Sequence, residues 1–422
     1  MRKVVVTGLG FASSIGSCRN SVITSLLDLR HGFVPFPVRE GELRAPKWYG
    51  SVKDYTVEGW DPEDWAYPSR FEIPQSELKS MSPGVLYAHC ATRDALRDAQ
   101  VSEEEASCPM TGLYSASGGS AGRQHQQLTI MEDRGLSRCS PYSVVSSTVG
   151  TINFNLGASL KIRGALCGFA SACASSAHAL GLARDAIALG RQDRMIVLGA
   201  EDCTREMILP FATMRALSQA EDAESASCPF DVRRSGFVGS GGATTLILEA
   251  ADLAESRGAP IYAELGGWGE AGDGHSPAMP HPDGRGLVEA MRRALREASL
   301  APEAIDYVNA HATATPVGDR AELRALKTVF GERGKDGPAI SSTKGLTGHP
   351  LSMSGALEGA ICCLALKEDF IPGSAHIEKL DAEAEGLNVV TKSSRATLNV
   401  AQSNSSGFGG SNVSLIFRRW GS

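Results

Sequence analysis

The chain has 422 residues, of which 42% are hydrophobic and 21% are charged, and its formal net charge is -7 at pH 7. This length is enough to bury a large core in one big domain or two, and the composition is typical of a soluble globular enzyme. The negative charge argues against bulk binding to nucleic acid or to an anionic membrane, although a local basic patch is compatible with it.

The N-terminal segment MRKVVVTGLGFASSIGSC predicts a buried first strand at residues 4–7 that ends in a tight turn. Its basic residues, apolar run and small residues before Cys18 also resemble a lipoprotein signal, but the apolar run is short and broken by glycine. GLGFAS partly matches the dinucleotide-binding fingerprint, but Ser13 occupies the third glycine position and no clean acidic residue follows a second strand. We therefore expect neither export nor nicotinamide binding.

Farther along the chain, apolar runs that favour strands alternate with segments of helical spacing. The strand candidates are residues 195–199, 304–309, 339–342 and 397–402, and the final SNVSLIFRR is expected to pair with the strand before it. Apolar residues three and four positions apart predict helices around Leu180 and Ile187, around Leu287, Met291 and Leu295, and around Leu323, Leu326 and Phe330. The alternation predicts an α/β fold with largely parallel, buried sheets.

The polar stretch AADLAESRGAPIYAEL divides the chain near residue 255, and the strand–helix rhythm starts again after it, as in a pseudo-repeat. We therefore expect two halves, 1–255 and 256–422. Residues 35–80 and 120–145 lack clear periodicity and are expected to cover a site or to meet a partner chain. No apolar run approaches the roughly 18 residues of a membrane helix. The ten cysteines contain no CxxC pair, which suits reduced thiols in a cytoplasm better than disulfides or a zinc site.

Four polar or glycine-rich segments follow strand candidates: SACASS at 171–176, HATATPVGD at 311–319, KGLTGH at 344–349 and SNSSGFGGSN at 403–412. Ligands of α/β sheets gather outside the carboxyl ends of the strands, so we expect these segments to converge on one site. Two of the nine histidines, His311 and His349, lie in them, and this concentration favours a functional site.

Cys173 lies among alanines and serines at the expected first turn of a helix, where free N–H groups and the helix dipole stabilise a thiolate and an oxyanion. The alternative for an isolated cysteine is a small buried hydrophobe. His178 lies about 500° farther around the same helix, so it is expected to pack structurally. Together with His311, His349 and Lys344, Cys173 suits acyl transfer to sulfur and stabilisation of negative charge on a second substrate.

These residues resemble those of the β-ketoacyl-[acyl carrier protein] synthases, and the resemblance extends from VVVTGLGFASSIG to SNSSGFGGSNVSLIFRR. It is strongest to the synthase I branch, through KIRG, SACASSAHALG, LGRQD and FDVRRSGFVGSGG. The resemblance implies the thiolase fold, an α/β fold in which two similar halves stack as α-β-α-β-α layers. It also implies a homodimer, or a ketosynthase heterodimer, that extends an acyl chain by two carbons in a decarboxylative condensation.

The resemblance further implies a role for each reacting residue. Cys173 corresponds to the nucleophile that accepts the acyl group. His311 and His349 correspond to the pair that drives decarboxylation of the malonyl thioester and stabilises the resulting enolate. Lys344 corresponds to the lysine that supports this charge pattern, and Glu358 to the acid that holds the lysine and local water.

Other residues are implied to handle the substrate. Phe408 corresponds to a gating phenylalanine whose N–H completes the oxyanion hole, and Thr313 and Thr315 correspond to hydroxyls that bind the phosphopantetheine arm. Because both substrates arrive on the phosphopantetheine of an acyl carrier protein, we expect no cofactor and no metal. Basic residues near the expected entrance are candidates for docking this acidic carrier: Lys79, Arg134 and Arg138.

The chain also departs from the family pattern. Ala312 stands where glycine is usual, Ala314 where glycine or serine is usual, and Ser235 where an acidic residue follows the arginine. The usual GAAG after the second histidine is SMSG, residues 352–355. These changes add bulk near the histidines and the pantetheine path, so a specialised lipid or polyketide pathway is an alternative to housekeeping fatty-acid synthesis.

Two other functions remain open. A non-condensing partner subunit that shapes the cavity of a heterodimer is one, and the presence of Cys173, His311, His349 and Lys344 argues against it. Another thiolase-fold acyltransferase or hydrolase is the second. Two histidines and a lysine suit decarboxylation better than hydrolysis, which needs one base and water.

Overall fold

The computed structural model describes residues 1–42, 44–57, 59 and 61–421. The structure contains one large sheet of eleven strands. The first half of the chain contributes five of them: β1 (Val4–Ala12), β4 (Thr111–Ala116), β5 (Leu166–Phe169), β6 (Arg194–Glu201) and β7 (Gly242–Ala250). The second half contributes β8 (Ala263–Gly272), β9 (Tyr307–Asn309), β10 (Ala339–Ser341), β12 (Asn388–Val389), β14 (Val400–Gly407) and β15 (Ser411–Arg418). These strands hydrogen-bond in the order β12-β10-β9-β14-β15-β8-β1-β7-β6-β4-β5.

The strand pairing repeats between the two halves. In the first half β7 lies antiparallel between β1 and β6, while β4 runs parallel to both β6 and β5. In the second half β15, β8, β14, β9 and β10 take the same relative places and directions. Only Val5 and Val6 of β1 pair with β8, so the junction between the halves is narrow. The expected pseudo-repeat is therefore confirmed.

The expectation of largely parallel sheets is wrong, because each half is mixed. Antiparallel pairing surrounds β7 and β15, and parallel pairing is confined to the strands beyond them. A tight hairpin joins β14 to β15, a connection that only antiparallel strands allow.

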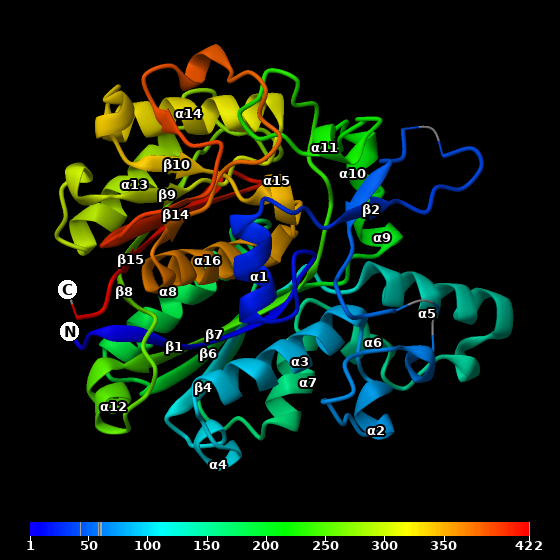
Figure 1. Cartoon of the computed structure of the whole chain (residues 1–422). Helices are drawn as coiled ribbons and strands as arrows, with labels where there is room; N and C mark the ends of the chain where they lie inside the picture. The colour runs from blue at the N-terminus through cyan, green and yellow to red at the C-terminus, as the bar shows by residue number, and fades with distance from the viewer. Residues whose placement is uncertain (43, 58, 60, 422) are drawn as a thin grey trace.

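The long helices form three layers, with the two halves of the sheet between them (Figure 1). Helices α8 (Ser175–Ala188) and α16 (Ser354–Glu368) lie in the centre, and each packs against strands of the sheet. Helices α3 (Pro83–Asp98) and α7 (Thr151–Ser159) cover the outside of the first half, and α13 (Arg285–Glu297) and α14 (Pro316–Phe330) cover the second. Three large apolar clusters fill the spaces between these layers, which gives the α-β-α-β-α stack.

The remaining elements are short, apart from α5. The other helices are α1 (Arg19–Leu27), α2 (Gln75–Leu78), α4 (Glu103–Ala106), α5 (Ala121–Arg134), α6 (Ser143–Ser147), α9 (Arg205–Ile208), α10 (Pro210–Thr213), α11 (Ala223–Ala226), α12 (Ala251–Ser256) and α15 (Lys344–Thr347). Two small hairpins pair β2 (Phe33–Pro35) with β3 (Trp48–Gly50) and β11 (Phe370–Ile371) with β13 (Ser394–Arg395). Among the described residues, no helix has both the length and the apolar character to cross a membrane.

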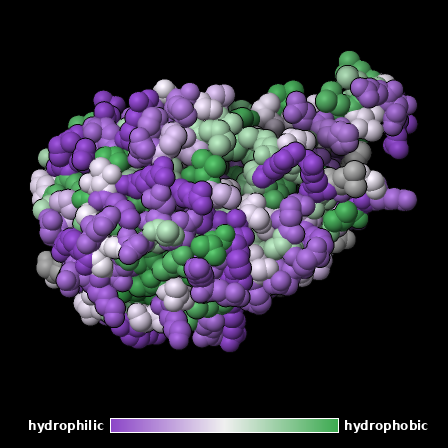
Figure 2. Space-filling model, turned by 90° about the horizontal axis from the view of Figure 1, so that it is seen from above, coloured by the Kyte–Doolittle hydropathy of each residue, from purple (hydrophilic) through white to green (hydrophobic). Residues whose placement is uncertain are grey.

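The sequence located six strands of the sheet, β1, β6, β9, β10, β14 and β15, and did not predict β4, β5, β7, β8 and β12. The strand expected from residue 304 begins only at Tyr307, because Pro302–Ala304 form a 3-10 turn. The segment 120–145, which shows no apolar period, contains the 14-residue helix α5, which projects at the right of Figure 1. Its residues are mostly polar, so α5 has no apolar stripe by which it could be recognised. Seen from above the view of Figure 1, the surface of the molecule is largely hydrophilic with separate hydrophobic patches (Figure 2).

The packing of α8 against α16 depends on small residues at the start of both helices. A Cβ on Gly355 would lie 2.4 Å from the amide nitrogen of Ala177, which leaves no room for a side chain. The hydroxyl of Ser176 accepts the N–H of Ala356 at 2.9 Å, so a residue of α8 satisfies an otherwise free amide of α16. This contact brings together the chain segments that precede the two helices.

Substituting Gly355→Ala is expected to lower the melting temperature by the equivalent of about 1–3 kcal/mol, because the added methyl must displace backbone. Gly272→Ala is the matched control, since a Cβ there meets no atom within 4 Å. Differential scanning calorimetry of both variants checks the prediction. Equal melting temperatures for Gly355→Ala and the parent chain would show that the helices do not approach as closely as described.

Candidate active site

Four loops at the carboxyl ends of strands meet at one site. Cys173 lies between β5 and α8, His311 follows β9, His349 lies between α15 and α16 after β10, and Phe408 lies in the hairpin after β14. All four residues line the same pocket, which has a volume of about 260 Å³. These are the four segments that the sequence analysis expected to converge, and parallel strands of both halves deliver them to one edge.

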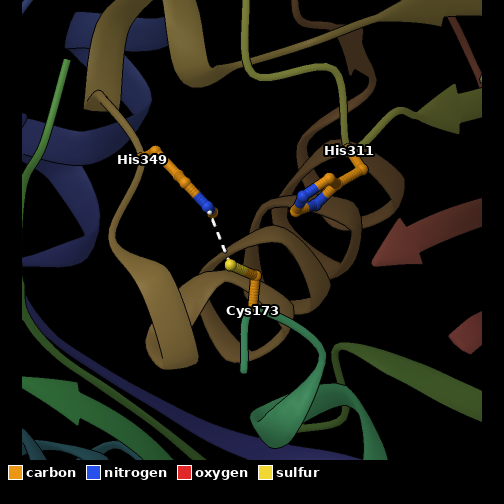
Figure 3. Close-up of side chains that lie close together, drawn as sticks. All are labelled: Cys173, His311 and His349. Carbon is orange, nitrogen blue, oxygen red and sulfur yellow. Dashed lines mark hydrogen bonds between the residues drawn. The ribbon is translucent and has the colours of Figure 1, made fainter. Parts of the chain in front are cut away.

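The thiol and the two imidazoles are in close contact (Figure 3). The Sγ atom of Cys173 lies 3.0 Å from Nε2 of His349. The ring of His311 approaches from the opposite side, with its centroid 5.3 Å from that of His349 and the two planes almost perpendicular. All three residues are less than a tenth exposed. A reacting group that enters the pocket therefore meets one nucleophile and two imidazoles in a largely dry environment.

The local backbone places Cys173 in a fixed bend just before helix α8. Helix α8 begins at Ser175 with Ala174 as its N-cap. Cys173 therefore precedes the first turn of the helix, whereas the sequence analysis expected it within that turn. Ala172 has a φ of 51°, and the hydroxyl of Ser175 accepts the N–H of Ser171, which together fix the bend before the helix. A Cβ on Gly407 would lie 3.2 Å from the Cys173 nitrogen. The hairpin residue before Phe408 thus packs directly against the cysteine backbone.

Burial keeps the reacting groups neutral. It raises the pKa of the Cys173 thiol to about 12, and the Lys344 ammonium opposes this only in part. Burial, assisted by the same ammonium, lowers the pKa of both His311 and His349 well below the ordinary 6.5. The expectation of a stabilised thiolate at Cys173 is therefore wrong, because desolvation outweighs the nearby cation.

The cation belongs to a buried ion pair. The ammonium of Lys344 donates to Oε1 of Glu358, and both side chains are almost completely buried. Burial raises the pKa of Glu358 to about 7, against the opposing effect of Lys344. The pair lies behind the pocket lining, so it acts on Cys173 and the histidines through its field rather than by contact.

A carboxylate that the sequence analysis missed supports the loop of His311. Glu322 accepts the N–H groups of His311 and Ala312 at 2.9 and 2.7 Å. It lies on α14 and is 4% exposed. Glu322 could have been identified from the sequence, because it falls on the predicted apolar face of the helix that includes Leu323 and Leu326. An acidic residue on a buried helix face requires a partner, and here the partners are the backbone amides of the loop that carries His311.

The residues expected to handle substrate divide into two groups. Thr313 and Thr315 line the pocket with hydroxyls 3.1 Å apart, and the ring of Phe408 lies 6.0 Å from that of Phe211, at the opening. The basic candidates lie elsewhere on the surface, outside the pocket lining: Lys79 after α2, Arg134 at the end of α5, and Arg138 in the following 3-10 turn. The basic residue that does line the pocket, Arg215, was not identified from the sequence.

The departures from the family pattern surround this site. Ala314 has a φ of 67°, a conformation that favours glycine, and its carbonyl accepts the N–H of Gly236. Ser235 lines the pocket. In the SMSG segment, the N–H of Ser352 donates to Glu201, and the hydroxyl of Ser354 lies 3.2 Å from Nδ1 of His349.

Three further histidines, His178, His31 and His376, lie outside the pocket lining. His178 contacts Ser171 and Glu270, in agreement with the structural role expected for it. Two clusters of the described residues bring three ligand atoms within 4.8 Å: Cys173 with His311 and His349, and His31 with Glu224 and His376. A soft metal in the first would block the nucleophile. In the second, Nδ1 of His31 accepts the N–H of Phe33, and Nε2 of His31 lies 3.2 Å from Glu224.

Comparison with known proteins agrees with this site. The family model described as "Beta-ketoacyl synthase, N-terminal domain" matches residues 1–254, and "Beta-ketoacyl synthase, C-terminal domain" matches residues 262–378. The 3-oxoacyl-[acyl-carrier-protein] synthase 1 of Haemophilus influenzae is 38% identical over the full length of both chains. A beta-ketoacyl synthase from Burkholderia phymatum superposes with a TM-score of 0.89 at 30% identity, over 99% of this chain and 100% of that one. The ishigamide ketosynthase/chain length factor structure gives 0.85 at 27% identity, over 100% of each chain.

The layered fold and these ketosynthase neighbours define an enzyme of the thiolase fold. The chain belongs to the beta-ketoacyl synthase family.

The raised thiol pKa makes a prediction for alkylation. Because the thiolate fraction grows about tenfold per pH unit below the pKa, carboxamidomethylation of Cys173 by iodoacetamide is expected to accelerate from pH 7 to about pH 9.5 without a plateau. Peptide mapping after brief treatment measures the rate, with the exposed Cys18 and Cys167 as internal references. A rate that levels off below pH 8 would mean that the thiol is already ionised near neutrality.

Proposed function

We propose that this protein is a β-ketoacyl-[acyl carrier protein] synthase, which condenses a malonyl thioester with an acyl group held on Cys173. The observation that supports this most strongly is a buried thiol in contact with one neutral imidazole, His349, and within 4.8 Å of a second, His311. A hydrolase needs a base and a water, whereas a decarboxylase needs donors for a developing oxyanion and little water. The site provides the second combination.

In the first half-reaction, Cys173 attacks the carbonyl carbon of an acyl thioester on the carrier protein. His349 takes the thiol proton on Nε2, since that nitrogen lies 3.0 Å from the sulfur. The amides of Cys173 and Phe408 stabilise the oxyanion of the tetrahedral intermediate. Collapse breaks the bond to the carrier thiol, which leaves with the proton from His349, and the acyl group remains on Cys173.

In the second half-reaction, the malonyl thioester enters past Thr313 and Thr315, which bind its phosphopantetheine arm. His311 and His349 donate to the thioester oxygen while the carboxylate is lost as carbon dioxide, so the electron pair remains as an enolate. The enolate carbon attacks the acyl carbon on Cys173. Cleavage of the carbon–sulfur bond releases a chain longer by two carbons, and the Cys173 thiolate takes up one proton.

Lys344 and Glu358 complete this proposed site. The ammonium of Lys344 favours the oxyanions of both half-reactions, and its ion pair with Glu358 holds it behind the pocket lining. The thioesters supply the chemical activation, so the reaction uses no further cofactor and no metal. The cysteine comes from the proposed half 1–255, and the histidines and lysine come from the proposed half 256–422.

The partners follow from the same reaction. An acidic acyl carrier protein delivers both substrates, and Lys79, Arg134, Arg138 and the pocket residue Arg215 are candidates to receive it. One relative is named 3-oxoacyl-[acyl-carrier-protein] synthase 1, and a solved neighbour is named a ketosynthase/chain length factor. Both names fit a cytoplasmic enzyme of fatty-acid or specialised lipid synthesis. A non-condensing subunit of a heterodimer is the second candidate, and the complete set of reacting residues disfavours it.

The assay that tests this function separates the half-reactions. His311→Ala is expected to accept a radiolabelled acyl group on Cys173 and yet to release carbon dioxide from malonyl carrier protein about 100- to 1000-fold more slowly, because it removes a donor to the oxyanion. His349→Ala is expected to release carbon dioxide as slowly and also to load the acyl group more slowly than His311→Ala, because it removes the proton acceptor of Cys173 as well. The control is His178→Ala, whose side chain faces Ser171 and Glu270. Carbon dioxide release at the parental rate by both variants would refute the two-histidine mechanism.

The edge of the sheet generates a prediction about assembly. Strand β5 is the last strand of the sheet, and Leu166 on it is 46% exposed, near other exposed apolar residues of α6 and α7. An uncovered apolar edge favours pairing with a second copy. Light scattering is expected to give twice the 44.5 kDa chain mass, and Leu166→Asp is expected to shift the protein toward monomer.

The comparable variant Val232→Asp, at an exposed apolar residue on a loop away from this edge, is expected to stay dimeric. A stable, active monomer of the parent chain would contradict the assembly proposed here.

A further inference from the structure

The carboxyl end of β6 lies against the segment that links His349 to α16. A Cβ on Gly199 would lie 2.6 Å from the Cα of Met353, so the strand backbone meets the 3-10 turn before α16 with no side chain between them. Two residues farther along the same face of β6, Oε1 of Glu201 accepts the N–H of Ser352 at 3.2 Å. The end of this strand therefore both packs against the turn and binds one of its amides.

Glu201 joins this turn to a second loop. The same Oε1 atom accepts the N–H of Gly118 at 3.1 Å, in the loop that follows β4. The side chain is almost completely buried and comes from the last residue of a central strand. Burial raises the pKa of Glu201 to about 7, and the proposed reaction does not use this carboxyl group. A carboxyl oxygen accepts both N–H groups whether or not the other oxygen carries a proton.

The turn depends on external support because its backbone is strained. Leu351 has a φ of 49°, a left-handed conformation that is unfavourable for a residue with a Cβ. Such a conformation persists only where neighbouring contacts hold it in place. The amide of Ser352 directly follows Leu351, so Glu201 fixes the peptide that would otherwise turn as the strain relaxes. On the other side, the N–H of His349 donates to the carbonyl of Val238 at 2.7 Å, so the histidine is held from both directions.

We infer that Glu201 is a positioning residue that keeps His349 within reach of Cys173 by holding the strained turn that follows the histidine. This inference rests on the proposed function for the steps that His349 performs. Without the carboxyl group, Leu351 relaxes from the left-handed region and displaces the histidine, which is only two residues away. Nε2 of His349 lies 3.0 Å from Sγ of Cys173, and a misplacement of about 1 Å in a reacting group costs about 100-fold in rate.

The test separates the contact of Glu201 from its charge, and the measurement is carbon dioxide release from malonyl carrier protein. Glu201→Ala is expected to lower kcat about 10- to 100-fold with little change in KM, because the contact acts on the histidine rather than on the substrate arm. Glu201→Gln loses the charge but keeps an acceptor oxygen, so it is expected to stay within about threefold of the parent with an unchanged pH profile. Glu201→Asp keeps the charge but withdraws the oxygen by one methylene, so it is expected to lose about tenfold.

A loss in Glu201→Gln as large as that in Glu201→Ala, with Glu201→Asp close to the parent, would overturn the inference, because the charge would then matter rather than the contact. If Glu201→Ala does not fold, the Gln and Asp variants still decide between the two.

Asp202→Ala is the matched control, because Asp202 is an equally buried carboxyl group beside Glu201. Its oxygens accept the N–H of Gly84 at 2.8 Å and the hydroxyl of Ser120, on segments that do not include His349. This variant is expected to lower the melting temperature as Glu201→Ala does, and yet to keep kcat per folded molecule within about threefold of the parent. Equal losses of kcat in the two variants would mean that general loosening causes the effect, and the inference would fall.

A double-mutant cycle identifies the residue through which Glu201 acts. In a His349→Ala background, Glu201→Ala is expected to have no further effect on kcat, whereas in a His311→Ala background it keeps its full effect. Equal effects in both backgrounds would contradict a role that operates through His349.

Crystal structures of the variants give a readout that needs no substrate. In Glu201→Ala, the distance from Nε2 of His349 to Sγ of Cys173 is expected to lengthen by about 1 Å, and Leu351 is expected to leave the left-handed region. In Glu201→Gln, both features are expected to stay as they are in the parent. An unchanged distance in Glu201→Ala would overturn the inference. If the parent chain released no carbon dioxide but the geometry changed in this way, the proposed function would fall and the positioning role of Glu201 would stand.

Discussion

The close packing of α8 against α16 is the constraint on which the active site depends. Cys173 precedes one helix and His349 the other, so the distance between thiol and imidazole is set by how near the two helix starts can approach. Gly355 removes the side chain that would separate them, and Ser176 satisfies an amide of the neighbouring helix. Because α8 and α16 occupy equivalent places in the two halves, the pseudo-repeat itself brings nucleophile and histidine together.

Burial then determines the protonation of the site. In a wet cleft, a cysteine beside a lysine and two histidines would tend toward a thiolate and an imidazolium. Here desolvation holds the thiol and both rings neutral, and the ammonium of Lys344 is paired with Glu358. Neutral imidazoles suit both half-reactions, since each can take a proton or donate one without a net buried charge in the resting state. The arrangement favours charge that appears only during the reaction, on the substrate oxygen.

The sequence predicted the main features of this architecture because its signals are local. Helical spacing predicted α8, α13 and α14. The polar segments after β5, β9 and β10, and the one that spans the hairpin between β14 and β15, identified the parts of the chain that meet at the site. The signals failed where structure depends on distant partners. Helix α5 has no apolar stripe, the antiparallel direction of β7 leaves no trace in its apolar run, and the pKa of Cys173 depends on burial by segments more than 100 residues away. The contact of Ser354 with His349 also could not be predicted, because it depends on how the start of α16 lies against the loop before it.

The most direct test of the account is intact-protein mass spectrometry of the chain through one turnover. With acyl carrier protein thioester alone, we expect one acyl group per chain, located at Cys173 by peptide mapping and absent from Cys173→Ala. Addition of malonyl carrier protein is expected to remove this group and to give a carrier-bound product larger than the original acyl group by a C2H2O unit. Release of the acyl group as a free acid, or its attachment to another residue, would contradict the account.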